Sequence, residues 1–226
     1  NSIYGGVEGL LVGNHQLQLN MRHDATEKND SADTGYVGYG YIFNEKFKFI
    51  GSAATGFSAP PIGYLYGQFG NPNLKPEYSR TFEVGFQYHD DSSLIRATIF
   101  QSRITNQIEF NAGFNNVREA VNEGLEVSAS KEILGWSTRS SLTIQDPRDA
   151  DTGERLRRRA ASLGSLSATR VFGNLRLGGD IAYTGSRPDG DNNLRPYWLA
   201  GITARYQVTK SYSLFGRIDN ILNENY

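Results

Sequence analysis

Hydrophobic and polar residues alternate along almost the whole chain with a period of two residues. In the stretch 82–89 the apolar or aromatic positions are Phe82, Val84, Phe86 and Tyr88, and the positions between them are Glu83, Gly85, Gln87 and His89. This period is typical of β-strands, because successive side chains of a strand point to opposite faces of the sheet. Helical periodicity is scarce. The pattern therefore predicts an all-β fold.

Twelve segments carry this alternation, and their lengths are unusual. They lie near residues 2–13, 16–25, 36–44, 47–58, 79–90, 93–110, 116–133, 136–147, 157–172, 174–188, 195–208 and 211–222. Strands of soluble proteins average about 5–6 residues, whereas a tilted strand that crosses a bilayer needs about 9–11. The lengths favour a transmembrane antiparallel β-barrel.

Short turns and longer polar loops connect these segments in strict alternation. The short turns lie at 13–15, 44–46, 89–92, 134–135, 173–174 and 209–211, and the loops lie near 26–35, 59–78, 107–116, 147–156 and 187–194. Outer-membrane barrels have short periplasmic turns and longer extracellular loops. We therefore expect the long loops to face the outside of the cell. A soluble β-sandwich, the alternative, has no reason to sort its connections by length.

Composition agrees with a membrane barrel. The chain has 13 Tyr, 12 Phe and 25 Gly, and no cysteine. No stretch approaches the roughly 20 apolar residues of a transmembrane helix, but alternation in a membrane barrel averages to a polar composition. The net charge of −1 gives no reason to expect nucleic acid as a partner. We expect membrane lipid and lipopolysaccharide around aromatic girdles that include Trp136, Tyr183, Tyr206 and Tyr212.

Two segments resemble TonB-dependent receptors of the bacterial outer membrane. The first contains Gly56-Phe57-Ser58-Ala59-Pro60, Leu65-Tyr66-Gly67 and Gly70-Asn71-Pro72-Asn73-Leu74-Lys75-Pro76-Glu77. The second is the ending Arg217-Ile218-Asp219-Asn220-Ile221-Leu222-Asn223-Glu224-Asn225-Tyr226. The resemblance implies a 22-stranded barrel filled by a plug domain and energised by TonB. On this basis residues 1–226 form one partial barrel, and we expect the plug, the early strands and the last strand to lie outside them.

Within this family the chain is most similar to the vitamin B12 (cobalamin) receptors. The supporting stretches are Phe57–Glu77, Tyr88–Val127, Leu156–Ala160 and Ala182–Arg187. The resemblance implies TonB-dependent uptake of a large, scarce nutrient. A siderophore or haem receptor of the same family is the first alternative, and a plug-free porin or adhesion barrel is the second.

The candidate ligand-binding residues are Arg158, Arg187, Tyr197, Tyr64, Tyr66 and Phe69. Arg158 matches an arginine that contacts ligand in the cobalamin subfamily, and a guanidinium can donate paired hydrogen bonds to amides, phosphate or carboxylates. We expect alternation to point Arg158 away from Arg157 and Arg159, at the start of a strand. The subfamily also has a tyrosine in the loop after Arg187, which this sequence lacks unless Tyr197 replaces it. A loop-bracing or lipopolysaccharide-facing arginine is the alternative reading.

The aromatic candidates lie in the proline-rich segment 59–78. Its prolines remove backbone donors, so this segment should not continue a β-ladder. We expect it to be chiefly a structural fold-back, with Glu77 accepting loop N–H groups. Direct ligand contact by Tyr64, Tyr66 or Phe69 is the alternative.

No catalytic or metal-binding pattern stands out. His15, His23 and His89 do not form a pair at ligand spacing, and no nucleophile–base set is present, so we do not expect an enzyme. Two acidic loops are weak calcium candidates: 24–33, and the loop with Asp146, Asp149, Asp151 and Glu154. Calcium needs about six to eight oxygen ligands, and we expect both loops to be solvated instead.

Overall fold

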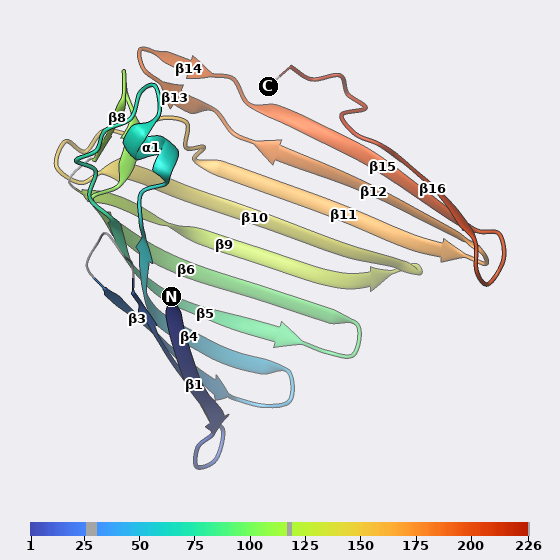
Figure 1. Ribbon diagram of the computed structural model, residues 1–226. Coiled ribbons are helices and arrows are strands. Elements are labelled where there is room, and N and C mark those ends of the chain that lie inside the picture. The colour runs from blue at the N-terminus through green and yellow to red at the C-terminus, as the bar shows by residue number, and fades with distance from the viewer. Residues whose placement is uncertain (26–30, 117–118, 226) are drawn as a thin grey trace. The chain divides into compact units, whose positions relative to one another are not determined.

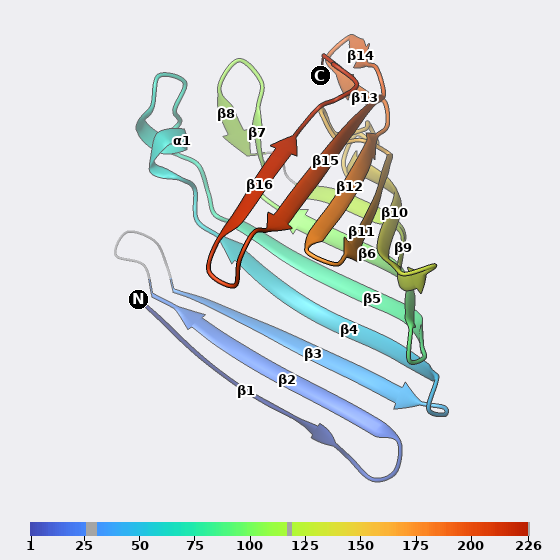
Figure 2. The same ribbon diagram turned by 90° about the vertical axis from the view of Figure 1, so that its right-hand side faces the viewer.

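A computed structural model describes residues 1–25, 31–116 and 119–225 of the chain, and their regular secondary structure is almost wholly β-strand (Figures 1 and 2). The long strands are β1 Ser2–Leu10, β2 His15–Asp24, β3 Ala32–Ile42, β4 Phe47–Ser58, β5 Glu77–His89, β6 Ser93–Thr105, β9 Glu119–Ile133, β10 Trp136–Asp149, β11 Ser162–Phe172, β12 Leu175–Thr184, β15 Tyr197–Gln207 and β16 Ser213–Ile218. The short elements are α1 Ile62–Tyr66, β7 Ile108–Phe110, β8 Phe114–Asn116, β13 Arg187–Asp189 and β14 Asn192–Leu194. In the described part of the chain, no helix has the length and apolarity needed to cross a membrane.

The twelve long strands form one sheet in sequence order, β1-β2-β3-β4-β5-β6-β9-β10-β11-β12-β15-β16. The pairs β1–β2, β2–β3, β3–β4, β10–β11, β11–β12, β12–β15 and β15–β16 are antiparallel. The hairpins β7–β8 and β13–β14 are separate two-stranded sheets. The all-β antiparallel fold and the twelve strands predicted from alternation are therefore confirmed.

The chain forms two compact units. Unit 1 comprises Asn1–Phe86, Thr98–Gly124 and Asp146–Leu156, and unit 2 comprises Gln87–Ala97, Leu125–Gln145 and Arg157–Tyr226. Unit 1 thus carries β1 to β4, α1 and the β7–β8 hairpin. Unit 2 carries β11, β12, β15 and β16 together with the β13–β14 hairpin.

The predicted short turns join consecutive strands, and their backbone geometry explains why they are tight. Leu134 and Gly135 have φ values of 52° and 77° between β9 and β10. Two central residues with positive φ are typical of the two-residue turn whose twist matches a β-hairpin. Between β5 and β6, the backbone N–H of Ser92 donates to Asp90 at 2.9 Å. This bond and the Tyr88 hydroxyl hold the pKa of Asp90 well below its usual range, so its carboxylate remains charged in the turn.

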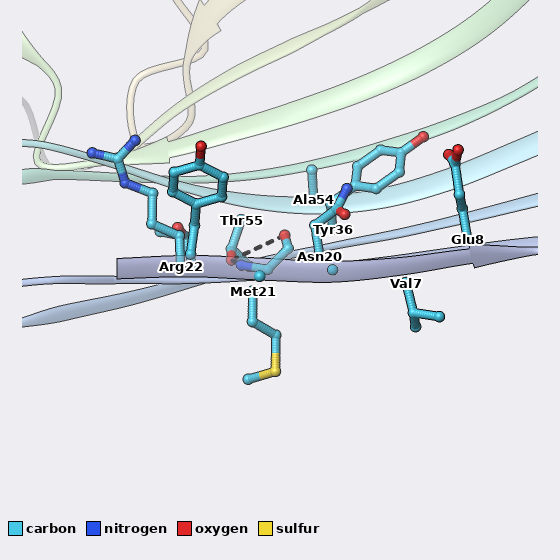
Figure 3. Close-up of a pocket in the computed structure, with 13 residues that line it drawn as sticks. Val7, Glu8, Asn20, Met21, Arg22, Tyr36, Ala54 and Thr55 are labelled. Carbon is cyan, nitrogen blue, oxygen red and sulfur yellow. Dashed lines mark hydrogen bonds between the residues drawn. The ribbon is translucent and has the colours of Figure 1, made fainter. Parts of the chain in front are cut away.

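Unit 1 shows the two faces of the sheet directly. Across β1, β2 and β3, Val7 pairs with Leu19 and Leu19 pairs with Val37. In Figure 3, Val7 and Met21 point to one side of the sheet, whereas Glu8, Arg22 and Tyr36 point to the other. The apolar side chains are exposed, and no large side chain among the described residues is fully buried. The apolar side chains of this fold therefore lie on one exposed face of the sheet and not in a buried core.

Three predicted loops contain short elements that alternation did not predict. The loop 59–78 contains α1, and the loops 107–116 and 187–194 contain the hairpins β7–β8 and β13–β14. Elements of three to five residues are too short to show a hydrophobic period. The strand predicted from residue 157 begins instead at Ser162.

Candidate ligand-binding site

The six candidate residues fall into two clusters, one in each unit. Tyr64, Tyr66 and Phe69 lie in or just after α1 of unit 1, where α1 packs beside the β7–β8 hairpin (Figure 1). Arg158, Arg187 and Tyr197 lie at the β13–β14 hairpin of unit 2. Arg158 and Arg187 lie in the loop regions of unit 2, whereas Tyr197 is the first residue of β15.

Four aromatic rings form what we call the aromatic loop cluster: Tyr64, Phe69, Phe110 and Phe114. The Tyr64 ring stacks on Phe114 with centroids 3.9 Å apart. Phe110 contacts the edges of Phe69 and Phe114, at centroid distances of 5.7 and 5.1 Å. Phe69 is nevertheless 53% exposed, and the neighbouring Tyr66 is 59% exposed. The loops thus present a partly exposed aromatic surface that can contact a ligand by stacking.

Asparagine side chains fix the loop 59–78 to the β7–β8 hairpin. The Asn71 amide donates to the Phe114 carbonyl at 3.1 Å. The Asn116 amide donates to the carbonyls of Lys75 and Asn106 and accepts from the Lys75 N–H, at 3.0, 2.6 and 2.8 Å. These bonds make the proline-rich segment a folded-back support for the aromatic loop cluster, as the fold-back interpretation expected.

Glu77 completes this support at the first residue of β5. Its Oε1 atom accepts the N–H of Ile108 at 2.7 Å, where the β7–β8 hairpin begins. The prediction that Glu77 accepts a loop N–H is therefore confirmed. Phe110, Phe114 and Asn116 were missed from the sequence, because their roles arise from contacts between segments more than 30 residues apart.

Replacing Asn116 with alanine should loosen the β7–β8 hairpin. The change removes two hydrogen bonds to Lys75 in the loop 59–78 and one to the Asn106 carbonyl, and a lost hydrogen bond costs about 0.5–1.5 kcal/mol. We expect faster cleavage by chymotrypsin at Phe110 and Phe114. Asn115→Ala is the matched control, because in the described part of the chain the Asn115 amide bonds only to Gly113, within the same hairpin. Equal cleavage rates in the two variants would contradict the supporting role of Asn116.

Arg158 binds the β13–β14 hairpin through its backbone and its side chain. Its N–H donates to the Pro188 carbonyl at 2.7 Å. Its guanidinium donates to the Asp189 carboxylate through Nε at 3.0 Å and Nη2 at 3.3 Å. The Arg158 side chain is still 70% exposed, so solvent or a ligand can reach it.

The strand predicted around Arg158 was wrong, because β11 begins only at Ser162. Arg157 and Arg158 lie in a turn, and Arg158 has a φ of 58°, so strand alternation does not set their directions. Positive φ is uncommon for a residue other than glycine and persists where neighbouring contacts hold it. The contacts of Arg158 with Pro188 and Asp189 stabilise this backbone conformation. Asp189 was missed, since the sequence gives no sign of which acidic residue lies beside Arg158.

Arg187 and Tyr197 contact each other beside the same hairpin. The Arg187 guanidinium carbon lies 5.0 Å from the centroid of the Tyr197 ring. The Arg187 Nη1 atom is buried without a hydrogen-bond partner in the described part of the chain. A guanidinium over a ring face is a cation–π arrangement. The pair places one tyrosine next to Arg187, where the resemblance expected a tyrosine from the following loop.

The two acidic loops considered as calcium sites do not form a metal site among the residues that the structure describes. Within residues 1–25, 31–116 and 119–225, no group of three or more His, Asp or Glu side chains could hold a metal ion. Asp146 contacts Arg148 and Arg155, and Asp149 accepts the N–H groups of Asp151 and Thr152. These partners occupy oxygens that a calcium cage would need. In the other loop, residues 26–30 lie outside the described part.

The polar face of β1 to β4 carries a separate pocket of about 590 Å³. Tyr4, Glu8, Asn20, Arg22 and Tyr36 are among its lining residues. Glu8 and Arg22 lie on this polar face, and Figure 3 shows both pointing to the same side. None of the six candidate ligand-binding residues lines this pocket.

Comparisons with known proteins agree with this fold. The family described as TonB dependent receptor-like, beta-barrel matches residues 2–221. The vitamin B12 transporter BtuB of Vibrio vulnificus (strain YJ016) is 29% identical over 218 residues, which cover 92% of this chain and 36% of that protein. The BtuB protein of Vibrio cholerae serotype O1 (strain M66-2) is 29% identical over 225 residues, which cover 93% of this chain and 36% of that protein. The chain thus spans about a third of the length of these curated relatives.

Solved receptor structures share the fold. A mutant of the ferric enterobactin receptor PfeA from Pseudomonas aeruginosa superposes with a TM-score of 0.78 at 20% identity, over 98% of this chain and 39% of that one. The copper transporter OprC gives a TM-score of 0.77 at 17% identity, over 100% of this chain and 41% of that one. Because the family match covers residues 2–221, the chain belongs to the TonB-dependent receptor β-barrel family of the bacterial outer membrane.

Proposed function

We propose that the chain is the loop-bearing barrel portion of a receptor that takes up cobalamin across the outer membrane with energy supplied through TonB. The observation that carries this proposal is the similarity to vitamin B12 transporters over more than nine-tenths of the chain. The family consists of receptors that transport nutrients and not of enzymes. The full-length protein would supply the plug domain that TonB engages.

The two loop clusters suit such a ligand chemically. Cobalamin carries a flat ring system, peripheral amides and a phosphodiester. The exposed Arg158 guanidinium can donate two parallel hydrogen bonds to a phosphate or to amide oxygens. The aromatic loop cluster offers ring faces and edges for apolar contact. We therefore assign polar recognition to Arg158 and apolar contact to Tyr66 and Phe69.

A ferric siderophore is the second candidate ligand. Aromatic rings and a guanidinium also suit an anionic, aromatic iron chelate, because the arginine offers charge complementarity and the rings offer stacking. The solved structures that share the fold include receptors named for ferric enterobactin. Haem is also an anionic, iron-containing molecule, and its flat ring could stack on the same aromatic side chains.

Uptake by whole cells tests the proposal. The full-length protein would be expressed in a host that lacks its own cobalamin receptor, with and without TonB, and supplied with radiolabelled cyanocobalamin. We expect saturable uptake that requires TonB and is not reduced by ferric enterobactin. Uptake of the iron chelate alone would favour the siderophore reading. Equal uptake without TonB would favour a plug-free pore.

A further inference from the structure

The apolar face of unit 2 is hollowed where small side chains lie side by side on neighbouring strands. On this face Leu166 pairs with Ile181 and Ile181 pairs with Ala200. In the next row Ala168 pairs with Gly179 and Gly179 pairs with Ile202. The small residues Ala168, Gly179 and Ala200 therefore line a depression between larger aliphatic side chains.

This depression is a pocket of about 420 Å³, which we call the outer-face pocket. Its lining includes Trp136, Leu166, Ala168, Leu177, Gly179, Ile181, Ala200, Ile202 and Ile221. Leu166 and Ile202 are each 48% exposed, so protein does not cover it. A Cβ atom added at Gly179 would have only the Gly201 carbonyl within 4 Å, at 3.7 Å, so the floor of the pocket has room at this position. In an outer-membrane protein, the molecules that meet such an apolar face are lipids.

A cation lies on the same face beside this pocket. Arg170 pairs with Leu177, which lines the pocket. The Arg170 guanidinium lies 4.7 Å from the centroid of Phe172, and Phe172 contacts the edge of Trp136 at 6.1 Å. Within the described residues, Arg170 forms no ion pair with a carboxylate. The guanidinium is therefore available to an external anion.

The position of Arg170 along its strand determines whether it would contact the headgroup or the acyl chains of a lipid. It lies two residues before the end of β11, beside the short turn that leads to β12. An arginine on the lipid face is strongly destabilising at the bilayer midplane but costs little stability near an interface. Trp136 and Phe172 beside it are aromatic, and girdles of aromatic residues mark both interfaces of such barrels. Arg170 thus lies at the headgroup level of the periplasmic leaflet, if the short turns face the periplasm.

We propose that the outer-face pocket and Arg170 form a binding site for one phospholipid of the periplasmic leaflet. An acyl chain occupies the pocket along Ala168, Gly179 and Ala200. The lipid phosphate accepts paired hydrogen bonds from the Arg170 guanidinium, the geometry that arginine favours with phosphate. The site is separate from the ligand-binding loops, so it does not depend on which nutrient the receptor carries.

Native mass spectrometry of the delipidated full-length protein, titrated with dioleoyl phosphatidylglycerol, tests this site. We expect the first lipid to bind at least about tenfold more tightly than the lipids that follow, as a charge-assisted contact predicts. Arg170→Gln should remove this difference in affinity between the first lipid and the later ones, and Arg170→Lys should retain part of it. Gly179→Leu, which fills the pocket, should also weaken the first binding step.

Two variants control for general effects on folding and charge. Gly216→Leu adds a side chain in open space on the same strand face but outside the pocket. Arg176→Gln removes a charge from the opposite face of β12, where Arg176 pairs with Val171 and Arg205. Both should bind the first lipid as the unchanged protein does, and heat-modifiable gel mobility would verify that every variant is folded. Equal affinity for all lipids, or equal losses in control and test variants, would overturn the proposal.

Discussion

Replacing Leu19 with arginine is expected to lower the free energy of unfolding in a phospholipid bilayer by about 2–4 kcal/mol, the cost of a cation on the lipid face near the midplane. Leu19 lies in the middle of β2 and pairs with Val7 and Val37 on the apolar face. An arginine there must desolvate its charge or distort the bilayer around it. Urea unfolding of the full-length protein in phosphatidylcholine vesicles measures the loss.

Gln18→Arg is the matched control one residue earlier. Gln18 lies on the opposite, polar face and pairs with Glu8, whose carboxylate would offset the new positive charge. We expect this variant to unfold within about 0.5 kcal/mol of the unchanged protein, as surface substitutions usually do. A larger loss at position 18 than at position 19 would mean that the two faces of the sheet have been assigned the wrong way round.

Replacing Arg158 with alanine is expected to weaken cobalamin binding by about 10- to 100-fold, since a hydrogen bond to a charged group contributes about 1.5–3 kcal/mol. The Arg158 guanidinium is exposed and held by Asp189 on the β13–β14 hairpin. This contact keeps the side chain oriented before a ligand arrives, which lowers the entropy lost on binding. Equilibrium binding of cyanocobalamin to the purified full-length protein gives the affinity ratio.

Arg159→Ala separates this role from a general loss of positive charge. Arg159 is adjacent in sequence and exposed, and within the described residues it forms no ion pair with a carboxylate. We expect the affinity of this variant for cyanocobalamin to stay within about twofold of that of the unchanged protein, because salt at physiological concentration screens the interaction between distant exposed charges. If both variants lost affinity equally, the positive charge of the loop and not the contact of Arg158 would explain the binding.

The strands were predictable because apolar side chains recur at every second residue along each strand of a membrane barrel. Phe82, Val84 and Phe86 alternate with polar residues over a long stretch, and β5 occupies that stretch. The turn at 134–135 was predictable because Gly135 readily adopts the positive φ that a tight reversal needs, although leucine is an uncommon residue at the φ of 52° found for Leu134. Register and strand order then follow from short antiparallel connections between successive strands.

The loops were less predictable, because contacts distant in sequence determine them. Nothing local indicates that Asn116 bonds to Lys75 or that Tyr64 stacks on Phe114. The start of β11 was placed too early, because residues 157–161, Arg-Arg-Arg-Ala-Ala, contain no glycine or proline that would separate the loop from the strand. The ligand-binding loops are therefore the part of this protein for which a structure adds most to the sequence.

Titration calorimetry of cyanocobalamin into the full-length protein, folded in detergent with calcium present, tests the proposed function most directly. Ferric enterobactin titrated under the same conditions is the comparison ligand. We expect saturable, one-to-one binding of cyanocobalamin and no heat of binding from the iron chelate. Absence of cyanocobalamin binding by a protein that is shown to be folded, together with saturable binding of ferric enterobactin, would contradict the assignment of cobalamin as the transported nutrient.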